Sequence, residues 1–312
     1  HVGVTGSGRE AMGAMVGADA VVDEINAHAT AVGRLHPGAD TIIEIGGQDS
    51  KFMRVMNGMI EDFEMNKACA AGTGSFFDEA AARVLGLMVE ELGDSALRAM
   101  APADLGEVCT VFMKSRIVQA QAEGYTPDDI SAGLAYSIAK NYLNKVKGGK
   151  PVGQKIVFQG GVSNNKAVVA ALEALTGKPI EVPEHAEVMG AIGMALIAKT
   201  RYENKLTAAR KTQGATGPAD ASLPEVAKLV ATKFRGLSSG FIPTEVVKGK
   251  RCAACANQCQ LMYLVTPEGK KLVYGPNCDL HNKSIPKELK RLSEHLPDLL
   301  QRRHELLTKD YL

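Results

Sequence analysis

Four of the six cysteines are clustered toward the C-terminal end of the sequence in a pattern that suits a metal site. Cys252, Cys255 and Cys259 follow a Cys-x-x-Cys-x-x-x-Cys pattern, and Cys278 comes after a predicted hairpin. Clustered cysteines in a cytoplasmic chain are more often metal ligands than disulfides, and four thiolates can hold Zn2+ or an iron–sulfur cluster. The spacer resembles that of a zinc ribbon, although ribbons usually use two Cys-x-x-Cys pairs. The pattern predicts a four-cysteine metal module and leaves its metal open.

The other two cysteines, Cys69 and Cys109, stand alone in the first half of the sequence. Cys69 lies in the glycine-rich segment CAAGTG before a predicted helix, where free amides and the helix dipole stabilise a thiolate. Two cysteines are too few for a [4Fe-4S] cluster, but a symmetric dimer supplies two from each chain. A free cysteine is often a small buried apolar residue instead. The bridging cluster accounts for both cysteines at once.

Paired glycines follow two predicted strands, in the segments IEIGGQDSK and IVFQGGVSNN. Because glycine has no side chain, the amides of Gly46-Gly47 and of Gly160-Gly161 can approach a phosphate closely. Glu44 before the first pair and Asp49 after it could hold a metal ion through water. A third loop, Gly72-Thr73-Gly74, precedes a predicted helix. Each loop alone could be a tight turn, whereas the three together favour nucleotide binding.

Strands and helices alternate up to about residue 200, which predicts an α/β domain that positions these loops. The predicted elements are a strand at 41–47, a hairpin around Asn57-Gly58, a helix at 127–147, a strand at 155–161, a helix at 164–175, a short strand at 180–183 and a helix at 185–198.

The composition changes beyond residue 200, which predicts further segments. Residues 1–200 carry 17 basic and 24 acidic side chains, a net charge of −7, whereas residues 201–312 carry 19 and 11, a net charge of +8. The predicted organisation is a nucleotide-binding α/β domain over 1–200, a linker with a helical segment over 201–247, the metal module over 248–282 and a helical segment over 283–312. Within the module, TPEGK is the predicted turn of a hairpin.

The composition excludes several classes of protein. Hydrophobic residues make up 45% and charged residues 23%, as in a folded domain, and no apolar run reaches the roughly 18 residues that cross a bilayer. The first residues lack the pattern of a signal peptide. Aromatic residues are scarce at 5% and Trp is absent, which disfavours single-stranded nucleic acid as a partner. We therefore expect a soluble, cytoplasmic protein with no membrane partner.

The first 200 residues resemble the ATPase activators of 2-hydroxyacyl-CoA dehydratases, a family that includes benzoyl-CoA reductase ATPase subunits. The matching segments, in order, are IIEIGGQDSK, MNKACAAGTGSFFD, CTVFMKS, IVFQGGVSNNKAVVAALE and EVMGAIGMALIA. The family belongs to the sugar kinase/actin/heat-shock chaperone superfamily. The resemblance implies an actin/sugar-kinase-like α/β ATPase fold, with ATP and Mg2+ as ligands.

The resemblance also implies roles for individual residues. The family's second phosphate loop corresponds to Gly46, Gly47, Gln48 and Asp49, and with Glu44 the last two are the predicted catalytic residues. The loop beside the cluster corresponds to Gly72, Thr73 and Gly74, and the adenosine loop to Gly160 and Gly161. Cys69 and Cys109 of two protomers would bridge one [4Fe-4S] cluster.

The implied activity is ATP-driven transfer of a low-potential electron to an iron–sulfur dehydratase or reductase. The implied electron donor is a ferredoxin or flavodoxin, and the implied assembly is a homodimer. The cysteine module resembles the linker of large multidomain activase-related proteins, in which the dehydratase-like component lies on the same chain. That context slightly favours a second iron–sulfur cluster over zinc in the module.

Two features depart from the family pattern. No acidic-glycine-serine/threonine loop of a first strand precedes His1, so we expect an ATPase domain cut on its N-terminal side, with weak nucleotide binding and little hydrolysis on its own. Lys114 and Arg116 stand after CTVF where many small activators carry acids. The segment EINAHA also matches the family, and we interpret its Glu24 and His28 as a hydrogen-bonded pair on one helix near the lobe junction rather than as metal ligands.

Two other functions fit part of the sequence. A non-redox, actin-like ATPase lobe with a zinc-ribbon module could dock protein or nucleic acid through the basic C-terminal region. A sugar or acetate kinase would share the fold but gives no role to Cys69 and Cys109.

Overall fold

The computed structural model describes residues 1–66, 73–75, 77, 85–212, 230–236, 245–252, 260–265, 269 and 271–274. These residues fall into two compact units. The first comprises His1–Gly13 and Gly17–Phe234, and the second comprises Ala14–Val16 and the residues from Arg235 onward. No helix in these ranges is both long enough and apolar enough to span a membrane.

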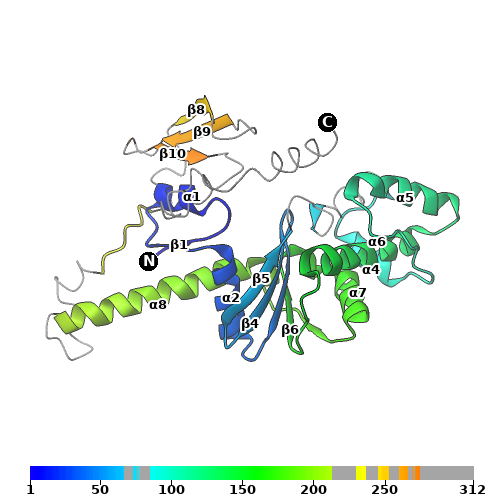
Figure 1. The fold of residues 1–312 in the computed structure, drawn as a ribbon, viewed down its shortest axis with the longest axis horizontal. Helices are drawn as coiled ribbons and strands as arrows, with labels where there is room; N and C mark the ends of the chain where they lie inside the picture. Colours follow the sequence, from blue (N-terminus) through cyan, green and yellow to red (C-terminus); the bar gives the residue numbers. More distant parts are fainter. Residues whose placement is uncertain are drawn as a thin grey trace, which may run out of the picture. The chain divides into compact units, whose positions relative to one another are not determined.

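A five-stranded sheet forms the centre of the first unit, with the order β5-β4-β3-β6-β7 (Figure 1). The strands are β3 (Thr41–Ile45), β4 (Ser50–Met56), β5 (Met59–Met65), β6 (Ile156–Gln159) and β7 (Ile180–Glu181). The first three are antiparallel neighbours, whereas β6 is parallel to both β3 and β7. Asn57 and Gly58 both have positive φ angles, 53° and 76°, as a two-residue hairpin turn requires. The hairpin predicted there is confirmed.

One face of the sheet is covered by helices α6 (Pro127–Asn141) and α7 (Lys166–Thr176), and Ile43, Phe52 and Phe158 face this side. Thr126 begins α6 with a capping box, and a π-helical segment, Tyr142–Lys147, continues it to the predicted end. Asn165 accepts hydrogen bonds from two amides at the start of α7. Helices α4 (Glu91–Leu97) and α5 (Thr110–Ala122) contribute buried residues to the same core.

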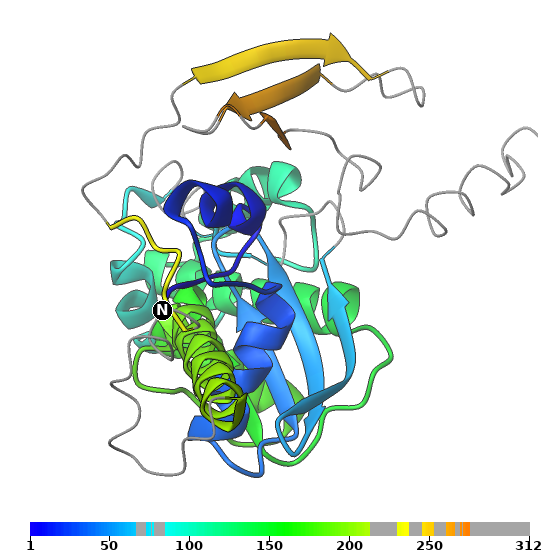
Figure 2. The ribbon, with the colours of Figure 1, turned by 90° about the vertical axis from the view of Figure 1, so that its left-hand side faces the viewer.

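Helices α2 (Glu24–Leu35) and α8 (Met189–Thr212) cover the opposite face, where Ile42, Met53 and Val157 form the apolar floor. The two helices lie side by side in both views (Figures 1 and 2). They approach so closely that a methyl group on Gly193 would overlap the backbone carbonyl of Ala27. Helix α8 continues well past the predicted end at residue 198. The short strands β1 (Gly3–Val4) and β2 (Ala20–Val21) pair in parallel, and α1 runs from Arg9 to Val16.

The second unit contains an antiparallel sheet with the order β10-β9-β8. Its strands are β8 (Glu245–Arg251), β9 (Gln260–Val265) and β10 (Lys271–Tyr274). The pairing of β9 with β10 confirms the hairpin expected around TPEGK. The predicted linker sequence KTQGATGPADASLP begins inside α8 with its first two residues, and the rest of it lies outside the described residues, as does the predicted C-terminal helical segment.

The close approach of α8 to α2 can be tested by adding a single methyl group. We expect Gly193→Ala to lower the free energy of unfolding by about 1–3 kcal/mol, because the methyl group displaces the Ala27 backbone. Chemical denaturation measures the change. Gly149→Ala is the control, since a methyl group there meets no described atom within 4 Å, and we expect a change within about 0.5 kcal/mol. Equal stability of Gly193→Ala and the wild type would contradict this packing.

Candidate functional site

A row of three polar side chains crosses the sheet beneath helix α2. Glu44 on β3 is in register with Lys51 on β4 and with Gln159 on β6, so the three side chains share the face of Ile42 and Val157. Their exposed fractions are 5%, 3% and 0%. Buried charged and amide groups are costly without partners, so this row requires a hydrogen-bond network.

The centre of the row is a buried ion pair. The Lys51 ammonium lies 2.8 Å from Oε2 of Glu44 and 3.4 Å from Oε1 of Glu24 on α2. Burial by itself would lower the pKa of Lys51, but the carboxylates of Glu44, Glu24 and Asp49 outweigh it and raise that pKa. Burial raises the pKa of Glu44 despite the attraction of Lys51. From the other side of the sheet, the buried hydroxyl of Tyr142 donates to the Lys51 carbonyl at 2.8 Å.

The second link between α2 and the sheet joins His28 to Gln159. Nε2 of the Gln159 amide lies 2.8 Å from Nδ1 of His28, so Nδ1 accepts and the ring proton lies on Nε2. Burial, with a contribution from Lys51, lowers the pKa of His28 to about 4. The sequence led us to expect Glu24 and His28 as a pair within one helix; instead each contacts a strand, because the sheet places Lys51 and Gln159 directly beneath them.

The turn between β3 and β4 is the first glycine loop. The Gly46 amide donates to the Asp49 carbonyl at 2.9 Å, which closes the turn. The Gly46 and Gly47 carbonyls accept hydrogen bonds from the amides of Gly74 and Ser75, both at 2.8 Å. The first and the third glycine loops are therefore joined by their backbones.

The second glycine loop packs against the same turn. Gly160 has a φ angle of 92°, and a methyl group there would overlap the Ile45 carbonyl and lie 3.0 Å from Oε1 of Glu44. A methyl group on Gly74 would come within 3.1 Å of the Val162 side chain. Position 160 requires glycine, and the two close approaches bring all three loops together beside Glu44. The chain continues from Gly160 into a short 3-10 helix, Gly161–Asn164.

The remaining predicted loop residues surround this junction. Gln48 is exposed and Asp49 is half-buried. Thr73 is fully buried, with its hydroxyl 3.0 Å from the Ser75 hydroxyl. Among the described residues, no heavy atom lies within 4 Å of a methyl group built on Gly47 or on Gly161, so both positions border open space.

The predicted metal ligands are described only in part. Cys109 immediately precedes α5 as its N-cap residue and is half-buried, and Cys252 is buried at the end of β8. Cys69, Gly72, Cys255, Cys259 and Cys278 lie outside the described residues. Within the described ranges, His, Cys, Asp and Glu side chains form no group of three or more that could hold a metal ion.

Two important residues of the site, Lys51 and Gln159, were not predicted. The segment SKFMRVM contains a weak signal for Lys51. Side chains alternate between the two faces of a strand, so Lys51 lies on the same face as the apolar Met53 and Val55, which are buried. Gln159 is the polar residue of the buried strand IVFQ, directly before the glycine pair. A polar residue in such a position indicates a partner from another element.

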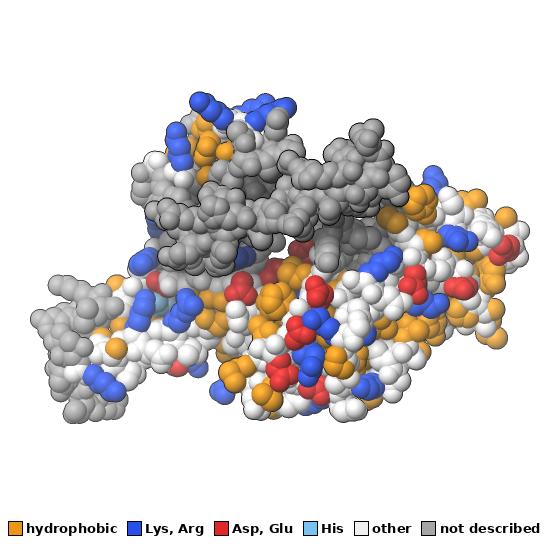
Figure 3. Space-filling model, in the orientation of Figure 1, with side chains coloured by type: hydrophobic (Ala, Val, Ile, Leu, Met, Phe, Trp, Pro, Cys, Tyr) orange, Lys and Arg blue, Asp and Glu red, His pale blue; other side chains and the backbone are white. Residues whose placement is uncertain are grey.

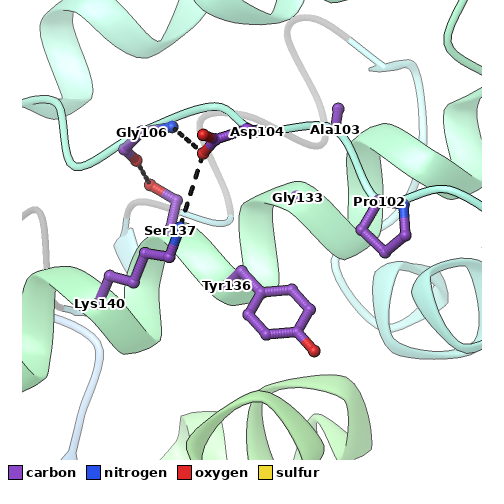
Figure 4. Close-up of a pocket in the computed structure, with 8 residues that line it drawn as sticks. All are labelled: Pro102, Ala103, Asp104, Gly106, Gly133, Tyr136, Ser137 and Lys140. Atoms are coloured by element: carbon purple, nitrogen blue, oxygen red, sulfur yellow. Dashed lines mark hydrogen bonds and ion pairs between the residues drawn. The ribbon is translucent and has the colours of Figure 1, made fainter. Parts of the chain in front are cut away.

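A hollow of about 300 Å3 lies elsewhere in the first unit, between α6 and the segment 102–106 (Figure 4). Its polar groups contact one another. The Ser137 hydroxyl donates to the Gly106 carbonyl at 2.7 Å, and the Lys140 ammonium lies 3.6 Å from the Asp104 carboxylate. We therefore assign the functional site to the glycine loops and not to this hollow.

The sheet order, the three converging glycine loops and the buried acid beside them define an α/β ATPase domain. Residues 1–198 match the BadF/BadG/BcrA/BcrD ATPase family, and the chain belongs to this family. Membership confirms the resemblance found in the sequence and the predicted fold class of this domain. The four-cysteine part of that prediction stays a prediction.

Individual relatives agree with this assignment. Over 182 residues the chain is 36% identical to a 2-hydroxyisocaproyl-CoA dehydratase activator of Clostridioides difficile, covering 58% of this chain and 68% of the relative. It is 34% identical over 197 residues to an (R)-2-hydroxyglutaryl-CoA dehydratase activating ATPase of Acidaminococcus fermentans, covering 62% and 73%. Among solved structures, the 2-hydroxyisocaproyl-CoA dehydratase activator from Clostridium difficile with bound ADPNP matches with a TM-score of 0.61 and 33% identity, covering 69% and 77%.

The buried state of His28 predicts its titration. We expect its ring to remain neutral until the pH approaches about 4, and NMR titration measures this, with His28→Gln identifying the resonance. The folded pKa lies below the ordinary value of 6.5, so the contribution to stability is complete above pH 6.5 and is lost as the pH falls toward 4. The loss amounts to about 3 kcal/mol. A midpoint near 6.5 in the folded protein would contradict the buried hydrogen bond.

Proposed function

We propose that this chain is the nucleotide-binding part of an activator that couples ATP to transfer of a low-potential electron. The acceptor is a dehydratase-like or benzoyl-CoA reductase-like component, and the donor is a ferredoxin or flavodoxin. The observation that carries the proposal is the convergence of three glycine loops beside one buried carboxylate, Glu44. Membership in an ATPase family and two relatives named as dehydratase activators support it.

The glycine loops suit the phosphates of ATP. Among the described residues nothing crowds Gly47 or Gly161, on the two loops that meet at Gly160, so a phosphate can approach their backbone amides. Glu44 and Asp49 supply carboxylates for Mg2+, which prefers oxygen ligands and retains several waters. Mg2+ neutralises phosphate charge when it is bound. We propose that Gln48, which is exposed in the turn between them, orients a water molecule.

Cys109 suits a cluster ligand at a subunit interface. Cys109 is half-buried, and its thiol makes no capping hydrogen bond to a described residue of α5. No acidic residue occupies the first turn of α5. The helix dipole there favours a thiolate. We propose that Cys69 and Cys109 of two protomers hold one [4Fe-4S] cluster, which supplies one-electron chemistry.

The outer surface of α5 suits contact with another protein. Phe112 and Val118 have exposed fractions of 65% and 51%, and exposed Lys114 and Arg116 lie on the same helix. Apolar side chains flanked by positive charge fit an acidic partner surface next to the cluster. We propose that this helix contributes to the surface of the homodimer that faces the dehydratase-like or reductase-like component.

The second unit supports an alternative function for part of the chain, that of an interaction module. Cys252 is buried at the end of β8, while Lys248, Lys250 and Arg251 on that strand are exposed. A buried cysteine beside an exposed basic strand fits a zinc-ribbon interaction module, which would dock protein or nucleic acid. In the electron-transfer proposal the four cysteines hold a second iron–sulfur cluster instead.

ATP hydrolysis by the full-length protein tests the nucleotide site. We expect Asp49→Asn to lower kcat by at least about tenfold, because Mg2+ loses a carboxylate partner, while the melting temperature stays unchanged. Asp62→Asn on the edge strand β5 is the matched control and leaves kcat unchanged. Equal activity of Asp49→Asn and the wild type would remove Asp49 from the site.

Metal analysis of anaerobically purified protein tests the cluster. We expect iron and acid-labile sulfide to fall in Cys69→Ser/Cys109→Ser, together with loss of the dimer, because both protomers supply ligands. Iron that remains in this variant would belong to the four-cysteine module. Zinc alone, unaffected by the substitutions, would contradict the redox function and support the interaction module.

A further inference from the structure

The Lys51 ammonium lies between two carboxylates from different parts of the fold. Glu44 belongs to the strand that leads into the first glycine loop, whereas Glu24 is in the first turn of α2. The nitrogen is 2.8 Å from the former and 3.4 Å from the latter. The side chain of Lys51 is 4% exposed, so solvent cannot replace either partner.

The two oxygens of Glu44 face different surroundings. Oε2 contacts Lys51, whereas Oε1 lies 3.1 Å from a methyl group built on Gly46 and 3.0 Å from one built on Gly160. Oε1 therefore lies at the junction of the two glycine loops. A cation held there would compete with Lys51 for this carboxylate.

We propose that Lys51 and Glu24 are positioning residues that let α2 respond to the magnesium nucleotide. The proposal rests on the proposed function. While the loops are empty, Lys51 holds Glu44 in place. A bound Mg2+ would compete with Lys51 for the Glu44 carboxylate. Lys51 would then move toward Glu24, which keeps the buried ammonium paired.

The second carboxylate makes this exchange inexpensive in free energy. A buried ammonium without a partner is strongly destabilising, so a protein with Glu44 alone would resist any loss of that contact. Glu24 is already within ion-pair distance and is more accessible, with its side chain 20% exposed. It can strengthen its contact by a small side-chain movement.

Glu24→Gln tests the exchange because it is nearly isosteric and removes one charge. We measure the affinity for ADPNP by calorimetry with Mg2+ and with EDTA, in the full-length protein. Since Lys51 then has Glu44 as its close partner, we expect the gain in affinity that Mg2+ provides to fall at least about threefold. Affinity in EDTA stays within about twofold of the wild type.

Glu61→Gln is the matched control. Glu61 also pairs with a cation on β4, at 3.1 Å from Arg54, but on the exposed hairpin surface where acidic and basic side chains are intermingled (Figure 3). The substitution Glu61→Gln removes the same charge as Glu24→Gln but leaves the contacts of Lys51 unchanged. We expect its Mg2+-dependent gain in affinity to equal that of the wild type.

A second background separates exchange through Lys51 from a general field effect of the Glu24 charge. In Lys51→Gln the ammonium is removed while Glu44, the proposed Mg2+ carboxylate, is kept, and the Gln amide can still donate a hydrogen bond to it. If Lys51 transmits the effect, Glu24→Gln changes the Mg2+ dependence by less than about twofold in this background. A field effect would persist there unchanged and would overturn the proposal.

The outcomes also separate this inference from the proposed function. If the wild type binds ADPNP with no Mg2+ dependence, or not at all, the proposed nucleotide site is wrong. If the wild type shows the dependence and Glu24→Gln behaves like Glu61→Gln, the nucleotide site stands and the role of Glu24 and Lys51 is overturned.

Discussion

The contact on which the first unit depends is the buried ion pair between Lys51 and Glu44. A charge placed in an apolar layer must be paired, and this requirement fixes the register of β4 against β3 at the point where the chain turns into the first glycine loop. The same requirement positions α2, since Glu24 completes the partners of Lys51. One ammonium thus connects a helix, two strands and a loop.

Close backbone approach is the second constraint. Gly160 lies where a side chain would displace the neighbouring turn, Gly74 packs tightly against the other two loops, and Gly193 allows α8 to contact α2. The glycines therefore have two separate roles. Those at the strand ends form the site, and the one in α8 brings a helix close enough to stabilise α2 above the polar row.

Much of this arrangement was predictable from local sequence. Asn57-Gly58 determines its hairpin because both positions need positive φ, and Pro127 with Thr126 determines the start of α6. The glycine pairs marked the loops in the same way. These signals depend on neighbouring residues alone, so a single sequence contains them.

The partners of buried polar groups were less accessible to prediction. The alternation in SKFMRVM gives only a weak signal for Lys51, because a charged residue in a hairpin is usually exposed; the pairing of β4 with β3, under α2, makes it internal. Glu24 and His28 are neighbours on one helix, yet their contacts lie on strands distant in sequence. Strand pairing decides such contacts, and it is not encoded by spacing along the chain.

Neither edge strand of the sheet favours pairing with another strand, since β7 has two residues and β5 carries Glu61, Asp62 and Glu64. Growth of the sheet by strand addition is thereby discouraged, which leaves the helices and loops as the surfaces suited to assembly.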